Sequence, residues 1–230
     1  MTIEIFPLEG IPEIHPGDDL AGLLAAAILP LAAKETDVLV VTHKVVSKAE
    51  GAIASIVSDE DYRAIVERES SAVLRRRGDL VIALTAHGFV CANAGVDRSN
   101  IDGNQVVLLP RDPDRSAHRL RLRLQRDLGV DLAVVISDTF GRAWRKGLVD
   151  VAIGVSGMKP IRDLRGTADM HGRILEVTEV AVADEIAAAA ELAMGKATGI
   201  PAALVRGVTI KREEGRATDM IRDPSADLFR

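Results

Sequence analysis

Four short stretches of this chain are almost purely aliphatic, and each of them stops at a polar or glycine-containing segment. They are residues 37–42, 131–137, 149–157 and 200–206. Short apolar runs bounded in this way are typical of strands that are buried on both faces. Apolar residues make up 47% of the chain but aromatic residues only 3%, so the core must be built from Ala, Val, Ile and Leu. The sequence therefore predicts a mixed α/β fold, with sheets packed against Ala/Leu-rich helices.

The segments between these runs show helix signals and further strands. Helices are predicted over 17–32, with Asp18 or Asp19 at the N-terminus, and over 58–78, 114–129 and 178–195. Further strands are predicted over 2–7 and as a pair over 79–88 and 89–100, joined at His87–Gly88. Residues 42–51 read as a polar turn, and Leu120, Leu122 and Leu124 line an amphipathic helix. We expect one domain over residues 1–230, because no repeat or linker interrupts the pattern.

Charge, cysteine content and hydropathy exclude several classes of protein. The formal net charge of -5 gives no basic face for nucleic acid. A lone Cys91 rules out an intrachain disulfide and a thiolate zinc cluster, and its position inside a strand indicates a small buried hydrophobe. No leader pattern or membrane-length apolar run is evident, since Pro30 breaks the longest one. The expectation is a cytoplasmic protein without membrane or nucleic-acid partners.

The common nucleotide and hydrolase motifs do not occur. Lys196 follows a glycine in "MGKATG", but the earlier glycine of a P-loop is missing and Ala197 replaces its Ser or Thr. The chain has no GxGxxG, HExxH or GxSxG sequence, so a Rossmann site, a zincin site and a nucleophile elbow have no support.

Two polar clusters follow apolar strands. Asp97 and Asn100 follow one, and Asp138 and Thr139 follow another. If the two strands end at the same sheet edge, the carboxylates form a site of hard oxygen ligands that suits Mg²⁺ or Mn²⁺ beside nucleotide phosphates. The competing interpretation is that both clusters are ordinary turns, since Asp, Ser and Asn bond to their own backbone.

Cationic clusters follow two of the predicted strands. Arg142 and Arg145 suit phosphate or carboxylate groups and, if this segment is helical, share one face of it, with Trp144 between them. His43, Lys44 and Lys48 follow another strand. Exposed, solvated basic turns explain both clusters equally simply.

Six ordered blocks of the sequence resemble one family, the GTP-dependent coenzyme F420-0:γ-glutamyl ligases. The blocks are "FPLEGIPEIHPGDDL", "VSKAEG", "CANAGVDRSN", "ISDTFGRAWRKGLVDVAIGVSGM", "LRGTADMHGRILEVTEVAVADEIAAAAELAMG" and "IPAALVRG". The resemblance runs from about Ile5 to Leu228. It implies that L-glutamate is joined to the carboxylate of F420-0, a deazaflavin phospholactate, at the expense of GTP. The implied route forms an acyl phosphate, which the glutamate amine then attacks, with GDP and phosphate released.

The resemblance also implies roles for individual residues. Asp97 and Asp138 match ligands of a first Mg²⁺ or Mn²⁺, and Thr139 matches a ligand of a second, completed by Glu213 or Glu214. The nucleotide would be bound by the residues Ile11, Pro12, Glu13, Ile14, His43, Lys44, Lys48 and Asn100. With Asp97 and Asp138, the cations Arg142 and Arg145 would complete the catalytic set. K⁺ is a further candidate cofactor.

The resemblance further implies an unusual ligase fold, an intertwined homodimer, and no nitroreductase-like domain within these 230 residues. Two alternatives stay open at this point. One is a related metal- and nucleotide-dependent ligase that acts on another carboxylate acceptor. The other is a non-catalytic module that binds a deazaflavin or a nucleotide, in which the acids are only turn residues. Sequence motifs alone do not distinguish GTP from ATP, or Mg²⁺ from Mn²⁺.

Overall fold

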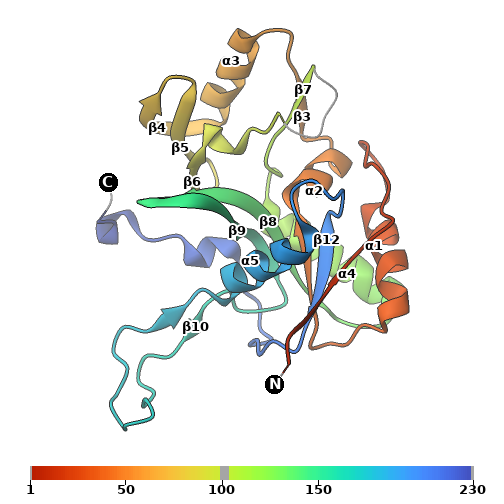
Figure 1. Ribbon diagram of the computed structural model, residues 1–230, viewed down its shortest axis with the longest axis vertical. Coiled ribbons are helices and arrows are strands. Elements are labelled where there is room, and N and C mark those ends of the chain that lie inside the picture. The colour runs from red at the N-terminus through yellow and green to blue at the C-terminus, as the bar shows by residue number, and fades with distance from the viewer. Residues whose placement is uncertain (1, 99–103, 229–230) are drawn as a thin grey trace.

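A computed structural model describes residues 2–98 and 104–228 of the chain. Its centre is a five-stranded sheet in the order β1-β12-β2-β8-β9 (Figure 1). The strands are β1 (Glu4–Pro7), β12 (Ala202–Arg206), β2 (Val38–Thr42), β8 (Ala133–Arg142) and β9 (Arg145–Ser156). Only β2 and β8 run parallel; the other neighbours are antiparallel. The four aliphatic runs thus form the four adjacent strands β12, β2, β8 and β9.

Helices cover both faces of this sheet. Helices α1 (Leu20–Ile28) and α4 (Pro113–Leu128) lie on one face, and α5 (Val182–Met194) lies on the other. Along β2 the side chains alternate between the two layers, so that Leu39 packs under α1 and α4 while Val38 and Val40 pack under α5. Because both faces are buried, every position of the strand must be apolar. The prediction of mixed sheets packed with helices is confirmed.

Two helices begin directly after polar residues whose side chains cap them. Asp19 caps α1 by accepting a hydrogen bond from the Gly22 N–H, and Ser58 caps α3 (Asp59–Glu69) through the Asp61 N–H. In α4, Leu120 and Leu124 face the core, whereas Leu122 is exposed. The amphipathic helix is confirmed, with a narrower apolar stripe than the three leucines indicated.

A smaller three-stranded sheet, β4 (Ser70–Arg77), β5 (Leu80–Thr85) and β6 (Val90–Ala92), packs beside α3. The short pair β3 (Ile53–Ser55) and β7 (Gln105–Val107) lies next to it. Helix α3, the smaller sheet and the β3–β7 pair share one core, which includes Ile65, Val66, Val81 and Val106 and is separate from the two cores of the central sheet. This unit positions Asp97, which bridges Val107 through backbone hydrogen bonds.

Two predicted elements were wrong. Residues 70–77, predicted as the end of a helix, form β4, because antiparallel pairing with β5 across the turn at Gly78 overrides the charge pattern. Residues 43–49, predicted as a polar turn, form helix α2 (His43–Ala49), which buries His43, Val46 and Ser47 on one side. The helical spacing of these three residues was hidden by the polar side chains.

Two segments project from the central sheet (Figure 1). One is the tip of the β8–β9 hairpin, where Arg142 pairs with Arg145 across a two-residue turn. Trp144 closes that turn with a φ of 58°, so the segment is not helical and Arg142 and Arg145 do not share the face of a helix. The other is the arm, residues 161–181, which carries β10 (Arg162–Asp163) and β11 (Glu179–Val180). No helix in the described part of the chain is long and apolar enough to cross a membrane.

Candidate active site

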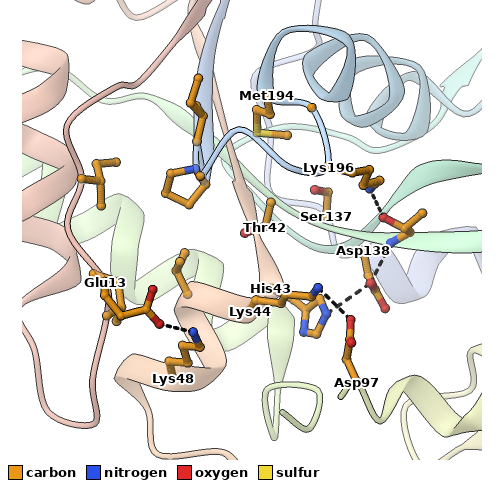
Figure 2. A pocket seen from close by; sticks show the side chains of 18 of the residues that line it. Glu13, Thr42, His43, Lys44, Lys48, Asp97, Ser137, Asp138, Met194 and Lys196 are labelled. Atoms are coloured by element: carbon orange, nitrogen blue, oxygen red, sulfur yellow. Dashed lines mark hydrogen bonds and ion pairs between the residues drawn. The ribbon is translucent and has the colours of Figure 1, made fainter. Parts of the chain in front are cut away.

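A cavity of about 1020 Å³ opens beside the adjacent strands β2 and β8. Its walls come from segments far apart in the sequence. They are the loop 11–16, the β2–α2 junction, the middle of β8, Asp97 and the loop 194–201 (Figure 2). The predicted nucleotide loop, Ile11 to Ile14, forms one wall as a continuous stretch.

Asp138 and Asp97 both reach this cavity, although they do not leave neighbouring strands of one sheet. Asp138 lies within β8, paired with Val151 of β9, rather than beyond the strand. Asp97 comes after the last strand of the smaller sheet, β6, and bridges Val107 of β7. Figure 2 shows the two carboxylates beyond the tips of the His43 and Lys44 side chains, with dashed lines joining His43 to Asp138 and Lys44 to Asp97. Asp97 and Asp138 therefore meet at one cavity as predicted, but they do so because the smaller unit packs against the central sheet, not because two strands end at the same edge.

Two side chains at the start of α2, those of His43 and Lys44, contact these carboxylates. Nε2 of His43 lies 3.2 Å from Oδ1 of Asp138, and Nζ of Lys44 lies 2.8 Å from Oδ2 of Asp97. His43 is only 2% exposed, and its Nδ1 has no hydrogen-bond partner among the described residues. One short helix thus places an imidazole and an ammonium against two acids that are 41 residues apart in sequence.

Lys48 is one turn further along α2 and joins the opposite wall. Its ammonium pairs with Glu13, and the side chain is largely buried whereas that of Glu13 is mostly exposed. Burial of an ammonium requires compensating charge. The pair therefore fixes the loop at residues 11–16 against α2 and keeps a positive group at the cavity surface.

A second acidic centre, which the sequence did not indicate, lies at Asp150. This residue of β9 is 2% exposed and sits directly across from Thr139 in the β8–β9 register. Its carboxylate accepts hydrogen bonds from Oγ of Ser137 at 3.0 Å and from Oγ1 of Thr139 at 2.6 Å. Nζ of Lys196 lies 2.7 Å from the same carboxylate. Strand register would have been needed to find this centre, because Asp150 stands inside an aliphatic run.

The other predicted site residues lie elsewhere. Arg142 and Arg145 stand on the exposed hairpin tip and do not line the cavity. Glu214 pairs with Arg121, and Glu213 with Lys211 at 2.8 Å, and neither lines the cavity. Arg121 also binds Asp131, which precedes β8, whereas Asp138 is toward the far end of that strand. Asn100 lies outside the described residues.

Cys91 is close to the site without being part of its surface. Burial, and then the charge of Asp138, raise the pKa of its thiol to about 12. A thiol of this kind stays protonated and unreactive at neutral pH. The prediction of a small buried hydrophobe agrees with this environment.

The donor set at the cavity fits a hard cation only in part. Carboxylate oxygens such as those of Asp97 and Asp138 suit Mg²⁺ or Mn²⁺. Within the described residues, however, no three His, Cys, Asp or Glu side chains are grouped closely enough to hold a metal ion. A divalent cation here would therefore complete its coordination with water and with oxygens of a bound molecule, for which the cavity has room.

Comparison with known proteins gives one consistent family. The family model of the F420-0:gamma-glutamyl ligases matches residues 10–207. The chain is 43% identical to the coenzyme F420:L-glutamate ligase of Methanothermobacter thermautotrophicus, over 100% of both chains. It is 45% identical to the ligase of that name from Methanopyrus kandleri, over 100% of this chain and 98% of the relative. For the Archaeoglobus fulgidus ligase the identity is 41%, with 100% and 97% covered. The chain is therefore an enzyme that belongs to the F420-0:gamma-glutamyl ligase family.

Proposed function

We propose that the protein joins L-glutamate to the carboxylate of coenzyme F420-0 in a reaction driven by GTP. The similarity to ligases with this name extends over whole chains. The structural observation that carries the proposal is the meeting of Asp97 and Asp138 at one cavity of about 1020 Å³, which has lysines on its walls. A cavity of this size accommodates a nucleotide beside an acceptor.

In the proposed reaction, a carboxylate oxygen of F420-0 attacks the γ-phosphorus of GTP. The bond from that phosphorus to the β–γ bridging oxygen breaks, and GDP leaves. The amine of glutamate then attacks the acyl carbon and loses a proton, and inorganic phosphate departs to leave an amide. Phosphoryl transfer of this kind depends on positioning and on stabilisation of negative charge.

The residues of the cavity suit these tasks. Lys48, held against the 11–16 loop, presents a point charge to phosphate oxygens of the nucleotide, and Lys44 does so beside Asp97. His43 is buried and fixed against Asp138, so it orients that carboxylate. A divalent cation held by Asp97 and Asp138 would offset phosphate charge and align the transferred group.

We further propose that the protein acts as a homodimer. Exposed apolar side chains gather on the two projecting segments, with Leu148 at the hairpin and Met170, Ile174 and Val177 on the arm. Larger exposed apolar patches mark interaction surfaces, and the three arm side chains all lie within residues 170–177. The Arg142 and Arg145 side chains lie on the same projecting hairpin, so a partner chain could bring them near a site that their own chain does not reach.

The decisive experiment is a ligation assay read by the mass of the product. With GTP, F420-0, glutamate and Mg²⁺ or Mn²⁺, we expect one or more added glutamyl residues and an equal number of GDP molecules. Omission of any component should stop GDP formation. GTP turnover without the acceptor, or no product with the full mixture, would contradict the proposal. Replacement of GTP by ATP, and of F420-0 by other carboxylates, tests the nucleotide and the acceptor separately.

A further inference from the structure

Lys196 occupies a special place in the cavity wall. It follows α5 in the loop 195–199, whose two glycines, Gly195 and Gly199, have φ of 66° and 75°. These left-handed conformations favour glycine and allow the chain to turn sharply on each side of the lysine. The loop returns to β12, and Lys196 points from it towards β8 (Figure 2).

Three oxygen-bearing side chains surround the Lys196 ammonium. Nζ lies 2.7 Å from Oδ1 of Asp150 and 3.8 Å from Oε1 of Glu191, and it donates a hydrogen bond to Oγ1 of Thr139. These contacts come from β8, β9 and α5. A hydroxyl oxygen and two carboxylates around one point form the environment that a hard cation takes in a protein. Here the cation is part of the chain.

An ordinary structural ion pair does not account for all of these contacts. Asp150 is almost fully buried and already accepts hydrogen bonds from Ser137 and Thr139, whereas the Lys196 side chain is 55% exposed and lines the cavity. The ammonium therefore connects a buried carboxylate with the space where substrates would bind. It also contacts Thr139, the residue next to Asp138 and the one that resembles a ligand of the second metal.

We propose that the ammonium of Lys196 fills the second cation position of this site, so that the enzyme binds one divalent cation per chain rather than two. The proposal rests on the proposed function, because it assigns to Lys196 a contact with phosphate oxygens of the nucleotide or of the acyl phosphate. It also explains why Glu213 and Glu214 lie away from the cavity, since no second metal needs their carboxylates.

Charge supports a single divalent ion. The ammonium offsets the charge of Asp150, and among the described residues Glu191 is the other carboxylate paired with it. A divalent cation placed beside the ammonium would meet a like charge within a few ångströms, at a cost that a partly dehydrated cavity increases. Asp97 and Asp138 each face a different side chain, Lys44 at 2.8 Å and His43 at 3.2 Å, and they are the acids to which the proposal assigns the one exchangeable ion.

Manganese binding tests the proposal without an activity measurement. Protein with a non-hydrolysable GTP analogue is titrated with Mn²⁺, and the bound ions are counted after removal of free metal and examined by electron paramagnetic resonance. We expect one Mn²⁺ per chain with the six-line spectrum of an isolated ion. Lys196→Glu removes the ammonium and adds a carboxylate, and should bind two Mn²⁺ with a broadened, spin-coupled spectrum.

Lys34→Glu is the matched control, because Lys34 is exposed and precedes β2 at the end opposite the cavity. It makes the same change in net charge and should still bind one Mn²⁺. Two ions, or none, in the unaltered protein would overturn the proposal, as would one ion in a folded Lys196→Glu protein. The count in the unaltered protein decides even if the variant does not fold.

Activity gives an independent readout. Lys196→Gln keeps the length of the side chain and removes its charge, so we expect kcat to fall on the order of 10²-fold or more, as for loss of one group that stabilises transition-state charge. An unchanged kcat would contradict the phosphate contact. Product formation by a protein that binds two Mn²⁺ would refute this inference alone. Absence of product from a protein that binds one would refute only the proposed function.

Discussion

The two ends of the β8–β9 hairpin differ in solvent exposure: one end is buried between helices and the other is exposed. Residues 133–137 and 152–156 are buried between α4 and α5, whereas residues 141–148 project as exposed backbone with Trp144 80% exposed at the turn. Asp138, Thr139 and Asp150 stand at the boundary between these ends. The difference teaches where an aliphatic strand can tolerate polar side chains, namely at the point where its covering helices end and a cavity begins.

Substitution at the boundary between the buried and exposed ends should have the largest effect, and this effect is on the ligation rate. Asp138→Asn removes a carboxylate while keeping shape, and we expect a loss of ligation rate on the order of 10³-fold, because charge stabilisation at the phosphates is removed. Asp79→Asn is the control: Asp79 is exposed and pairs with exposed Arg63, so the variant should retain activity. Comparable rates for the two variants would show that Asp138 is only a structural residue.

The buried end should be the next most sensitive. A Cβ added at Gly154 would lie 2.4 Å from the Pro113 carbonyl oxygen, whereas at Gly141, on the projecting end, nothing lies within 4 Å. We expect Gly154→Ala to lower the free energy of unfolding by about 3 kcal/mol, and Gly141→Ala to change it by no more than about 0.5 kcal/mol. Urea unfolding at one fixed protein concentration measures both. Equal stabilities would mean that β9 is not packed against α4.

The projecting side should affect assembly rather than folding. Val177 on the arm is 85% exposed, and Val57, near α3, is 89% exposed. If the arm forms the dimer interface, Val177→Asp should raise the dimer dissociation constant by tenfold or more, about 1.4 kcal/mol, while Val57→Asp leaves it unchanged. Sedimentation equilibrium distinguishes these outcomes. A monomer for the unaltered protein would refute the proposed homodimer directly.

The smallest expected effect is the alkylation of Cys91, which lies in β6 next to the boundary between the buried and exposed ends of the hairpin. Cys91 of β6 lies near Asp138, and with a pKa of about 12 its thiolate fraction at pH 8 is on the order of 10⁻⁴. We therefore expect negligible alkylation by iodoacetamide in the native protein, and a rate that rises as the pH approaches the pKa. Intact mass over time measures the adduct, with urea-unfolded protein as the reactive control. Rapid labelling of native protein at pH 8 would show that β6 does not shield this part of β8.

Much of this arrangement could be predicted from local sequence. The aliphatic runs located β2, β8, β9 and β12, because burial on both faces strongly favours apolar residues. Capping residues placed the starts of α1 and α3. For the site, the polar residues that follow β2 do meet Asp97, Asp138 and Thr139 at one cavity.

The rest depended on pairing between distant segments. Asp150 reaches the site only because register places it opposite Thr139, and Lys196 only because α5 ends beside β8. The search for a P-loop rejected the Gly-Lys pair on spacing, although the lysine does reach the proposed nucleotide cavity. The wrong helix at 70–77 has the same origin: pairing with β5 decided the structure and local charge did not.

The loop that carries Lys196 has a consequence for how the enzyme would respond to its surroundings. An ion taken from solution is bound in proportion to its free concentration, so two metal positions would make the rate depend on the second power of that concentration. A tethered ammonium has an effective concentration set by its short loop and by nothing outside the protein. One of the two cations would then be inherited with the polypeptide, and only the other would follow the supply of divalent metal.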